Sequence, residues 1–166
     1  MSTSADDRGG LTIAPCAYSS VDSTVLIESV QAEYVVRYGG RDETIVDPAE
    51  FAPPGGTFLV GYQHGEPVAC GGWRTARDGV AEIKRMYVVP SARRQGIAWA
   101  LLTELEIRAQ QAGFDEIWLE TGRNQPEALA MYERAGYRPV AAFGHYRDAE
   151  GAFHLGKSLG ETDRPA

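Results

Sequence analysis

The segment EIKRMYVVPSARRQGIA, which runs from Glu82 to Ala98, decides the fold of this chain. Apolar and β-branched residues dominate its first half, so a strand is predicted from Val80 to Val89, and Pro90 ends it. Apolar side chains then recur at helical spacing, which predicts a helix from Ala98 to Ala112. The loop Arg93–Gly96 joins the two, and such a loop at the start of a helix is typical of an anion-binding site.

The chemistry of this loop suits a diphosphate. The N–H groups of a first helical turn have no partners within the helix, and the helix dipole is positive at that end. Gly96 lets the backbone approach an anion, and Ala98 is small. Arg93 and Arg94 add positive charge, although a plain helix start with surface arginines remains the alternative. This loop matches neither GxxxxGK[ST] nor GxGxxG, which argues against a P-loop or a dinucleotide-binding loop at this position.

Turn and periodicity signals divide the rest of the chain into shorter elements. A helix is predicted from Asp22 or Ser23 to about Tyr38, where glycines end it, and a loop with a short turn follows over 41–56. The pair Gly71-Gly72 predicts a bulge. Because antiparallel hairpins come first and helix crossovers follow, the expected class is α/β (α+β) with a mixed sheet. The other predicted elements are a short helix at 125–135 and strands at 11–16, 57–62, 67–75, 116–120, 137–142 and 152–159.

Length and charge indicate one ordinary domain. The 166 residues fit a single domain over 11–160, with flexible ends expected at 1–10 and 161–166. A net charge of -7 argues against binding of nucleic acid or of an anionic membrane. No apolar stretch approaches the ~20 residues of a membrane span, and residues 1–10 lack the apolar run of a signal peptide. A cytoplasmic location is therefore expected.

The two cysteines, Cys16 and Cys70, form no CxxC pair and no metal-binding cluster. Each lies in apolar, strand-like surroundings and is expected to be a reduced, structural thiol. The sequence therefore predicts no metal site.

Several motifs in order resemble the GNAT superfamily of N-acetyltransferases. Arg93-x-x-Gly96-x-Ala98 resembles the signature [QR]-x-x-G-x-[GA], and Glu82–Val88 resembles the fourth strand of that family. Leu119–Gly122 resembles the fifth strand, and residues 124–137 the segment that follows, so the similarity covers about 57–159. The resemblance implies the GNAT fold: a mixed, mostly antiparallel sheet of about seven strands, splayed in the middle and flanked by helices. It also implies an enzyme that moves an acetyl group from acetyl-CoA to an amine of a small molecule or peptide by direct attack.

The resemblance further implies where acetyl-CoA binds. The pantetheine arm would lie between the splayed strands and pair with backbone, with the N–H of Val88 as an oxyanion-type donor. Asn124 would hydrogen-bond that arm, or would simply cap the following helix. The full set of residues implied for the cofactor is Met86, Tyr87, Val88, Arg93, Arg94, Gln95, Gly96, Ile97, Ala98, Trp99 and Asn124.

Tyr132 and Glu82 are the candidate catalytic groups. Tyr132 matches the family tyrosine that protonates the departing thiolate, although it could only pack beside the cofactor. Glu82 is the first choice for the base that deprotonates the amine, and Glu120 or a water is the alternative. Glu82 would face the side of Val88 only if no bulge resets the strand register. It could instead be a surface carboxylate paired with Lys84 or Arg74.

Acceptor selection is expected from the regions 33–47 and 143–154. Their acidic and aromatic side chains suit a cationic amine, whereas His145 and His154 are interpreted as local hydrogen bonders. A non-catalytic acyl-CoA sensor, a GNAT protein with another acyl donor or an O-acceptor, and a nucleotide-binding regulatory domain stay open, as does a homodimer. The side chains concerned are Glu33, Tyr34, Tyr38, Asp42, Glu43, Tyr146 and Asp148.

Overall fold

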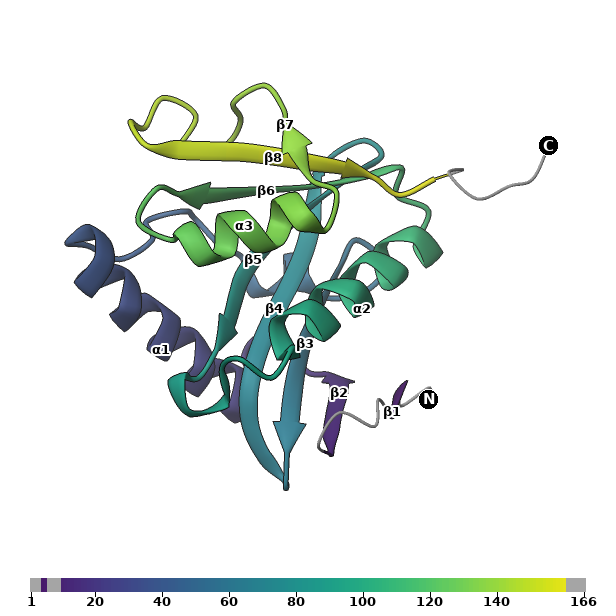
Figure 1. The fold of residues 1–166 in the computed structure, drawn as a ribbon. Coiled ribbons are helices and arrows are strands. Elements are labelled where there is room, and N and C mark those ends of the chain that lie inside the picture. Colours follow the sequence, from purple (N-terminus) through teal and green to yellow (C-terminus); the bar gives the residue numbers. More distant parts are fainter. Residues whose placement is uncertain (1–3, 6–9, 161–166) are drawn as a thin grey trace.

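The computed structural model describes residues 4–5 and 10–160, and within these residues eight strands form one sheet (Figure 1). The strands lie in the order β1-β2-β3-β4-β5-β6-β8-β7. The flexible ends predicted at 1–10 and 161–166 fall mainly on residues outside the described ones. Ser4 and Ala5 are described, and they form β1, a two-residue strand that pairs with β2.

The sheet is mixed and mostly antiparallel, as predicted. Antiparallel pairing connects β2 (Leu11–Pro15), β3 (Gly56–Gln63), β4 (Glu66–Arg77) and β5 (Val80–Val88) in turn. After a crossover through α2 (Ile97–Gln111), β6 (Glu116–Gly122) joins β5 in parallel. β8 (Ala152–Ser158) runs antiparallel to β6 and carries β7 (Arg138–Pro139) on its outer edge.

The predicted strand 137–142 is wrong in its length, since β7 covers two residues. Pro139 has no N–H to give to the ladder. The N–H of Val140 still donates to the carbonyl of His154 at 2.9 Å, after which the chain leaves the sheet. The other predicted strands and helices are present, with ends that differ by one or two residues.

The first helix, α1 (Val21–Tyr38), begins two or three residues earlier than its predicted caps, Asp22 or Ser23, suggest. The side chain of Ser20 accepts a hydrogen bond from the N–H of Ser23 at 3.2 Å, so Ser20 is the N-cap. Gly39 ends the helix, as predicted, in the left-handed conformation with φ of 80°. In the described part of the chain, none of the helices combines the length and the apolar character that crossing a lipid bilayer requires.

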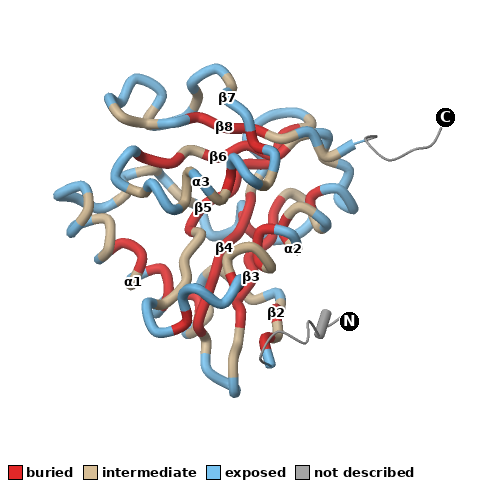
Figure 2. Tube along the Cα trace, viewed as in Figure 1, coloured by how far each residue is buried: buried red, intermediate tan, exposed pale blue. Residues whose placement is uncertain are grey.

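Helices cover both faces of the sheet and divide the core in two. α2 and α3 (Pro126–Arg134) lie over one face, where Leu101 and Leu105 pack against Trp73. The indole N–H of Trp73 donates to the carbonyl of Leu105 at 3.0 Å. α1 and a short 3-10 helix, Pro48–Phe51, cover the other face. Figure 2 shows the buried residues concentrated in the central strands.

β5 and β6 pair only at their first residues and then diverge. Residues 80–82 lie opposite residues 116–118, and among the described residues the pairing of the two strands ends there. Figure 1 shows the strands separating toward the side where α1 lies. This is the splay in the middle of the sheet that the family resemblance implied.

A bulge distorts β5 where it faces the predicted irregularity at Gly71-Gly72. Tyr87 lies opposite Cys70 and Lys84 lies opposite Gly72, so β5 has one residue more than β4 in this stretch. The extra residue is therefore on β5, not on β4. Arg85 lies at the bulge with φ of 63°, a left-handed conformation that residues other than glycine rarely adopt.

The bulge exchanges the faces to which β5 side chains point. Ile83 packs in the core under α2 before the bulge, and Met86 and Val88 pack in the same core after it. Glu82 and Lys84 alternate with Ile83, so they point to the face opposite Val88. The condition on which Glu82 could share a face with Val88 is therefore not met.

Candidate active site

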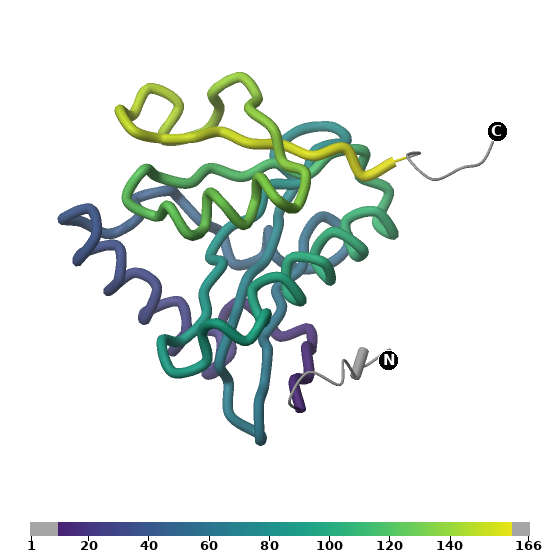
Figure 3. Tube along the Cα trace, viewed as in Figure 1, coloured from purple at the N-terminus to yellow at the C-terminus, as the bar shows by residue number. Residues whose placement is uncertain are grey.

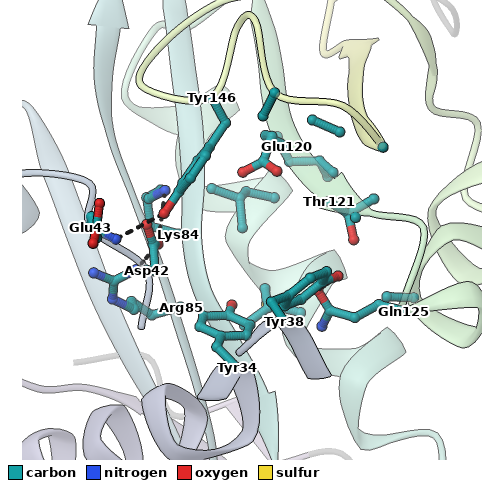
Figure 4. A pocket seen from close by; sticks show the side chains of 18 of the residues that line it. Tyr34, Tyr38, Asp42, Glu43, Lys84, Arg85, Glu120, Thr121, Gln125 and Tyr146 are labelled. Carbon is teal, nitrogen blue, oxygen red and sulfur yellow. Dashed lines mark hydrogen bonds and ion pairs between the residues drawn. The ribbon is translucent and has the colours of Figure 1, made fainter. Parts of the chain in front are cut away.

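A cavity of about 340 Å³ opens in the gap between β5 and β6 (Figure 4). Its walls come from the end of α1 with residues 40–43, from β5 around the bulge, from the end of β6 with α3, and from the loop 146–152. Figure 3 shows the end of α1 and the loop before β8 on the same side of the molecule. The cavity therefore joins the two regions predicted to select the acceptor with the gap predicted to hold pantetheine.

Glu120, near the end of β6, presents a carboxyl group to this cavity (Figure 4). Burial raises the pKa of Glu120 to about 7, although the positive charge of Lys84 acts in the opposite direction. A carboxyl group whose pKa is near neutral can exchange a proton with a substrate at neutral pH.

Across the cavity from Glu120, the carboxylate of Asp42 binds two cations (Figure 4). It contacts Nη1 of Arg85 and lies 3.3 Å from Nζ of Lys84. Thr44 donates to the same carboxylate through its N–H at 2.9 Å and its hydroxyl at 2.6 Å. Burial opposes the ionisation of Asp42, but the two cations outweigh it and hold its pKa well below the usual range. Asp42 is therefore an anion at neutral pH and no candidate base.

Tyrosines from α1 and from the loop before β8 complete the walls. The hydroxyl of Tyr146 accepts a hydrogen bond from the N–H of Glu43 at 2.8 Å. The hydroxyl of Tyr38 donates to Oε1 of Gln125, the residue before α3, at 3.0 Å. Tyr38 also lies against Gly122, where an added Cβ would overlap its hydroxyl. These contacts hold the end of α1 against both neighbouring segments.

Tyr132 of α3 lines the same cavity. It is 5% exposed, and its ring packs against that of Tyr137 with centroids 5.6 Å apart. Burial raises the pKa of Tyr132 above its usual value, so the phenol keeps its proton at neutral pH. The predicted acid thus lies in one cavity with Glu120.

Glu82 is not among the residues that line this cavity. Its carboxylate lies 3.2 Å from Nε of Arg74, which is the pairing considered as the alternative role for this residue. Arg74 in turn donates to the carbonyl of Ile45 at 2.9 Å. The structure therefore favours Glu120, the second choice, as the carboxylate that reaches a substrate.

The loop before α2 has the features of an anion site. Gly96 is the N-cap of α2 with φ of 76°, and no side chain caps the helix, so its first N–H groups are left for another acceptor. Arg94 is also left-handed, with φ of 64°, and exposed. Ile97 is buried and anchors the start of the helix, whereas Ala98 is partly exposed. The loop fits the diphosphate of coenzyme A.

Arg93 has partners that its sequence position did not predict. Its Nε donates to the carbonyl of Val88 at 2.9 Å, and its Nη2 lies 2.9 Å from the carboxylate of Glu33 on α1. Gln95 accepts a hydrogen bond from Gln63 at 2.9 Å. These side chains therefore tie the loop to its neighbours, and the backbone of the loop is the main candidate for binding an anion.

The end of β5 presents a free backbone edge to the gap. The N–H of Val89 donates to Val68 of β4 at 2.8 Å, and successive N–H groups alternate in direction along a strand. The N–H of Val88 therefore points toward the gap, as its predicted role requires. Met86 lines the cavity, whereas Tyr87 packs in the core beneath α1.

The remaining predicted residues lie at the margins of the site. Asn124 donates through its side chain to the carbonyl of Arg37 at 2.8 Å and does not cap α3, whose N-cap is Gln125. Trp99 stacks with Arg134, whose guanidinium carbon is 5.2 Å from the ring centroid. His154 accepts a hydrogen bond from the N–H of Phe143, and the ring of His145 packs against Tyr146. His154 thus makes a local hydrogen bond, as predicted, whereas the contact recorded for His145 is aromatic packing.

Lys84 and Arg85 line the cavity although they were not predicted to do so. The available signal was two successive charged residues within a predicted strand. In a regular strand only one of these two side chains could face the cavity. The bulge at Arg85 lets both face it, and the sequence alone did not place a bulge on this strand.

Comparisons with known proteins match this arrangement. Residues 24–137 match the model of the Acetyltransferase (GNAT) family. A relative from Azospirillum brasilense, named IAA acetyltransferase, is 34% identical over 122 residues, which cover 73% of this chain and 80% of the relative. The matched segment includes most of α1, the bulge, the loop before α2, and α3.

Two solved structures have the same fold. A protein of Klebsiella pneumoniae, provisionally named an acyl-CoA N-acyltransferase, has a TM-score of 0.76 at 29% identity, over 90% of this chain and 98% of its own. A GNAT family acetyltransferase of Elizabethkingia anophelis, solved with acetyl-CoA bound, has a TM-score of 0.64 at 16% identity, over 92% of this chain and 99% of its own. At the lower identity the likeness shows the fold alone.

Glu120→Gln should stabilise the fold at pH 8 and change its stability little at pH 4. The pKa of Glu120 in the folded chain, about 7, lies above the value of about 4.3 for an unperturbed glutamate. The folded state therefore holds the proton more tightly, and the free energy of unfolding falls as the pH rises through this window. At about 1.4 kcal/mol per pKa unit, the difference between the two proteins should reach about 3–4 kcal/mol at pH 8. Urea denaturation across this range measures it, and equal stabilities at pH 8 would contradict it.

Proposed function

The chain belongs to the GNAT acetyltransferase family and is an N-acetyltransferase that uses acetyl-CoA, and we propose that an amine of a small molecule or peptide enters the cavity between β5 and β6 and attacks the acetyl group directly. The observation that supports this acceptor and route is one cavity that holds both Glu120, with a pKa of about 7, and a protonated phenol, Tyr132. The first can take the proton that the amine must lose, and the second can supply the proton that the departing thiolate gains.

Acetyl-CoA supplies the thioester whose acetyl group is transferred. We assign its diphosphate to the uncapped N–H groups of α2 beside Gly96 and Arg94, because a helix N-terminus attracts negative charge. We assign the pantetheine arm to the free edge of β5, beside Met86. There the N–H of Val88 can stabilise the negative charge that develops on the thioester oxygen.

Glu120 acts as the base in this proposal. An alkyl amine is mostly protonated at neutral pH and has no lone pair for attack until it loses that proton. Glu120 is about half ionised at pH 7 and becomes a neutral acid when it accepts the proton, directly or through a water. Glu82 is the weaker candidate because Arg74 already holds its carboxylate outside the cavity.

Tyr132 acts as the acid. Its phenol is buried and protonated, so it can donate to the sulfur as the carbon–sulfur bond breaks. Because burial disfavours the phenolate, Tyr132 recovers its proton readily before the next turnover.

Gly96→Glu should abolish the binding of acetyl-CoA while the fold persists. The new carboxylate would occupy the anion site and repel the diphosphate. Gly113→Glu is the matched control, because it replaces another left-handed glycine next to the C-terminal end of α2, with nothing within 4 Å of its Cβ position. At 100 times its dissociation constant, acetyl-CoA should stabilise the native chain and the control by about 2.7 kcal/mol, measured by thermal unfolding. Normal stabilisation of Gly96→Glu would place the diphosphate elsewhere.

Glu120→Gln should lower kcat/KM by roughly 10²-fold near pH 7, and the defect should shrink as the pH rises, because more amine is then neutral without help. Glu82→Gln is the comparison, and its smaller loss should not depend on pH. Thiol release from acetyl-CoA with a panel of amines gives both pH–rate profiles. If the pH-dependent loss belonged to Glu82→Gln instead, the base would be Glu82.

Tyr132→Phe should lower kcat by roughly 10²-fold with little change in the affinity for acetyl-CoA, because it removes one hydroxyl and keeps the ring. Tyr137→Phe removes a neighbouring buried hydroxyl that does not line the cavity, and it should keep nearly full activity. Steady-state rates and calorimetry of acetyl-CoA binding make the comparison. Equal rates for the two variants would remove the acid role from Tyr132.

A further inference from the structure

The charges at the acceptor end of the cavity do not cancel. The side chains of Lys84 and Arg85 are 8% and 3% exposed, and both contact one carboxylate, that of Asp42. Asp42 is ionised at neutral pH. Among the described residues, one carboxylate therefore forms the ion pairs of both buried cations, and one positive charge has no ion-pair partner of its own. A buried charge without a partner is unfavourable, so the site favours an added anion.

Other charged groups around the cavity do not supply the missing negative charge. Arg41 and Glu43 lie on its exposed rim, and Arg41 pairs with Glu28 at 3.0 Å. Glu150 is 94% exposed. Glu120 has a pKa of about 7 and becomes neutral when it accepts a proton, so in that state it does not offset the extra positive charge of the protein.

The fold constructs this pair of cations. Successive residues of a regular strand point to opposite faces, so Lys84 and Arg85 could not both reach one carboxylate without the bulge. Arg85 adopts its left-handed backbone conformation at this point. The hydroxyl groups of Tyr34 and Tyr146 line the same cavity. Burial raises the pKa of Tyr34 and raises that of Tyr146 to about 12, and the charge of Asp42 adds to both shifts. Both hydroxyls are therefore protonated at neutral pH.

We propose that Lys84 and Arg85 bind a carboxylate of the acceptor, so that the substrate is a small amine that also carries a carboxylate group, as an amino acid does. The proposal rests on the proposed function, in which the amine lies at Glu120. Figure 4 shows the cluster of Lys84, Asp42 and Arg85 across the cavity from Glu120. An acceptor with an amine at one end and a carboxylate at the other would place its amine at Glu120 and its carboxylate at Lys84 and Arg85.

Acceptor specificity tests the proposal on the unaltered protein. Thiol release from acetyl-CoA is measured with matched pairs: several amino acids against their primary amides, and β-alanine against propylamine. The carboxylate member of each pair should have the higher kcat/KM, by about 10- to 100-fold, because its hydrogen bonds are charge-assisted. The amine of an amino-acid amide is less basic, so amine ionisation by itself would favour the amide.

Substitutions at Lys84 test where the carboxylate binds. Lys84→Met keeps the length of the side chain and removes its charge, so the preference for the carboxylate member should fall about 10-fold or more, while Lys84→Arg should keep it. Arg41→Met is the matched control, since it removes an exposed, already paired cation from the rim of the same cavity. Lys84 also lowers the pKa of Glu120, so each acceptor is compared at the plateau of its own pH profile.

The outcomes separate this inference from the proposed function. Equal kcat/KM within the pairs would overturn the carboxylate site and leave acetyl transfer to amines intact. Transfer to neither kind of amine, with acetyl-CoA still bound, would overturn the proposed acceptor as well. A preference that survives Lys84→Met would place the carboxylate elsewhere. Should that variant fail to fold, Tyr146→Phe removes one donor from the same site and should lower the preference selectively.

Discussion

The separation of β5 from β6 after three residue pairs is the constraint on which the site depends. Backbone groups that leave a ladder need other partners. Along β5 the carbonyl of Val88 finds one in Arg93, while its N–H faces the gap and is left for a ligand. The gap also admits side chains from α1, from α3 and from the loop before β8, and these form the walls of the cavity (Figure 4).

Electrostatic interactions across the cavity connect Glu120 to the cluster of Lys84, Asp42 and Arg85. Burial by itself would raise the pKa of Glu120 further, and the charge of Lys84 limits the rise to about 7. Asp42 in turn limits the field of Lys84 and Arg85, because it neutralises one of the two charges. Lys84 therefore acts on both groups: it limits the proton affinity that burial gives to Glu120, and it is one of the two cations that contact Asp42.

Local signals in the sequence predicted most of the fold. Periodicity predicted α1, α2 and the strands, and the loop before α2 followed from glycine, arginine and the start of a helix. The choice between Glu82 and Glu120 could not be made, because it depends on whether a single extra residue reverses the faces of β5. The same holds for pairs distant in sequence, such as Arg93 with Glu33, Tyr38 with Gln125, and Tyr146 with Glu43. Only the folded chain brings these together.

The contact between Gly122 and Tyr38 has an evolutionary consequence. A Cβ at position 122 would overlap the hydroxyl of Tyr38, so a larger residue there requires a smaller or displaced side chain at 38. The hydroxyl of Tyr38 also holds the start of α3, so such an exchange would reshape the entrance that an acceptor uses. Positions 38 and 122 should therefore covary among relatives.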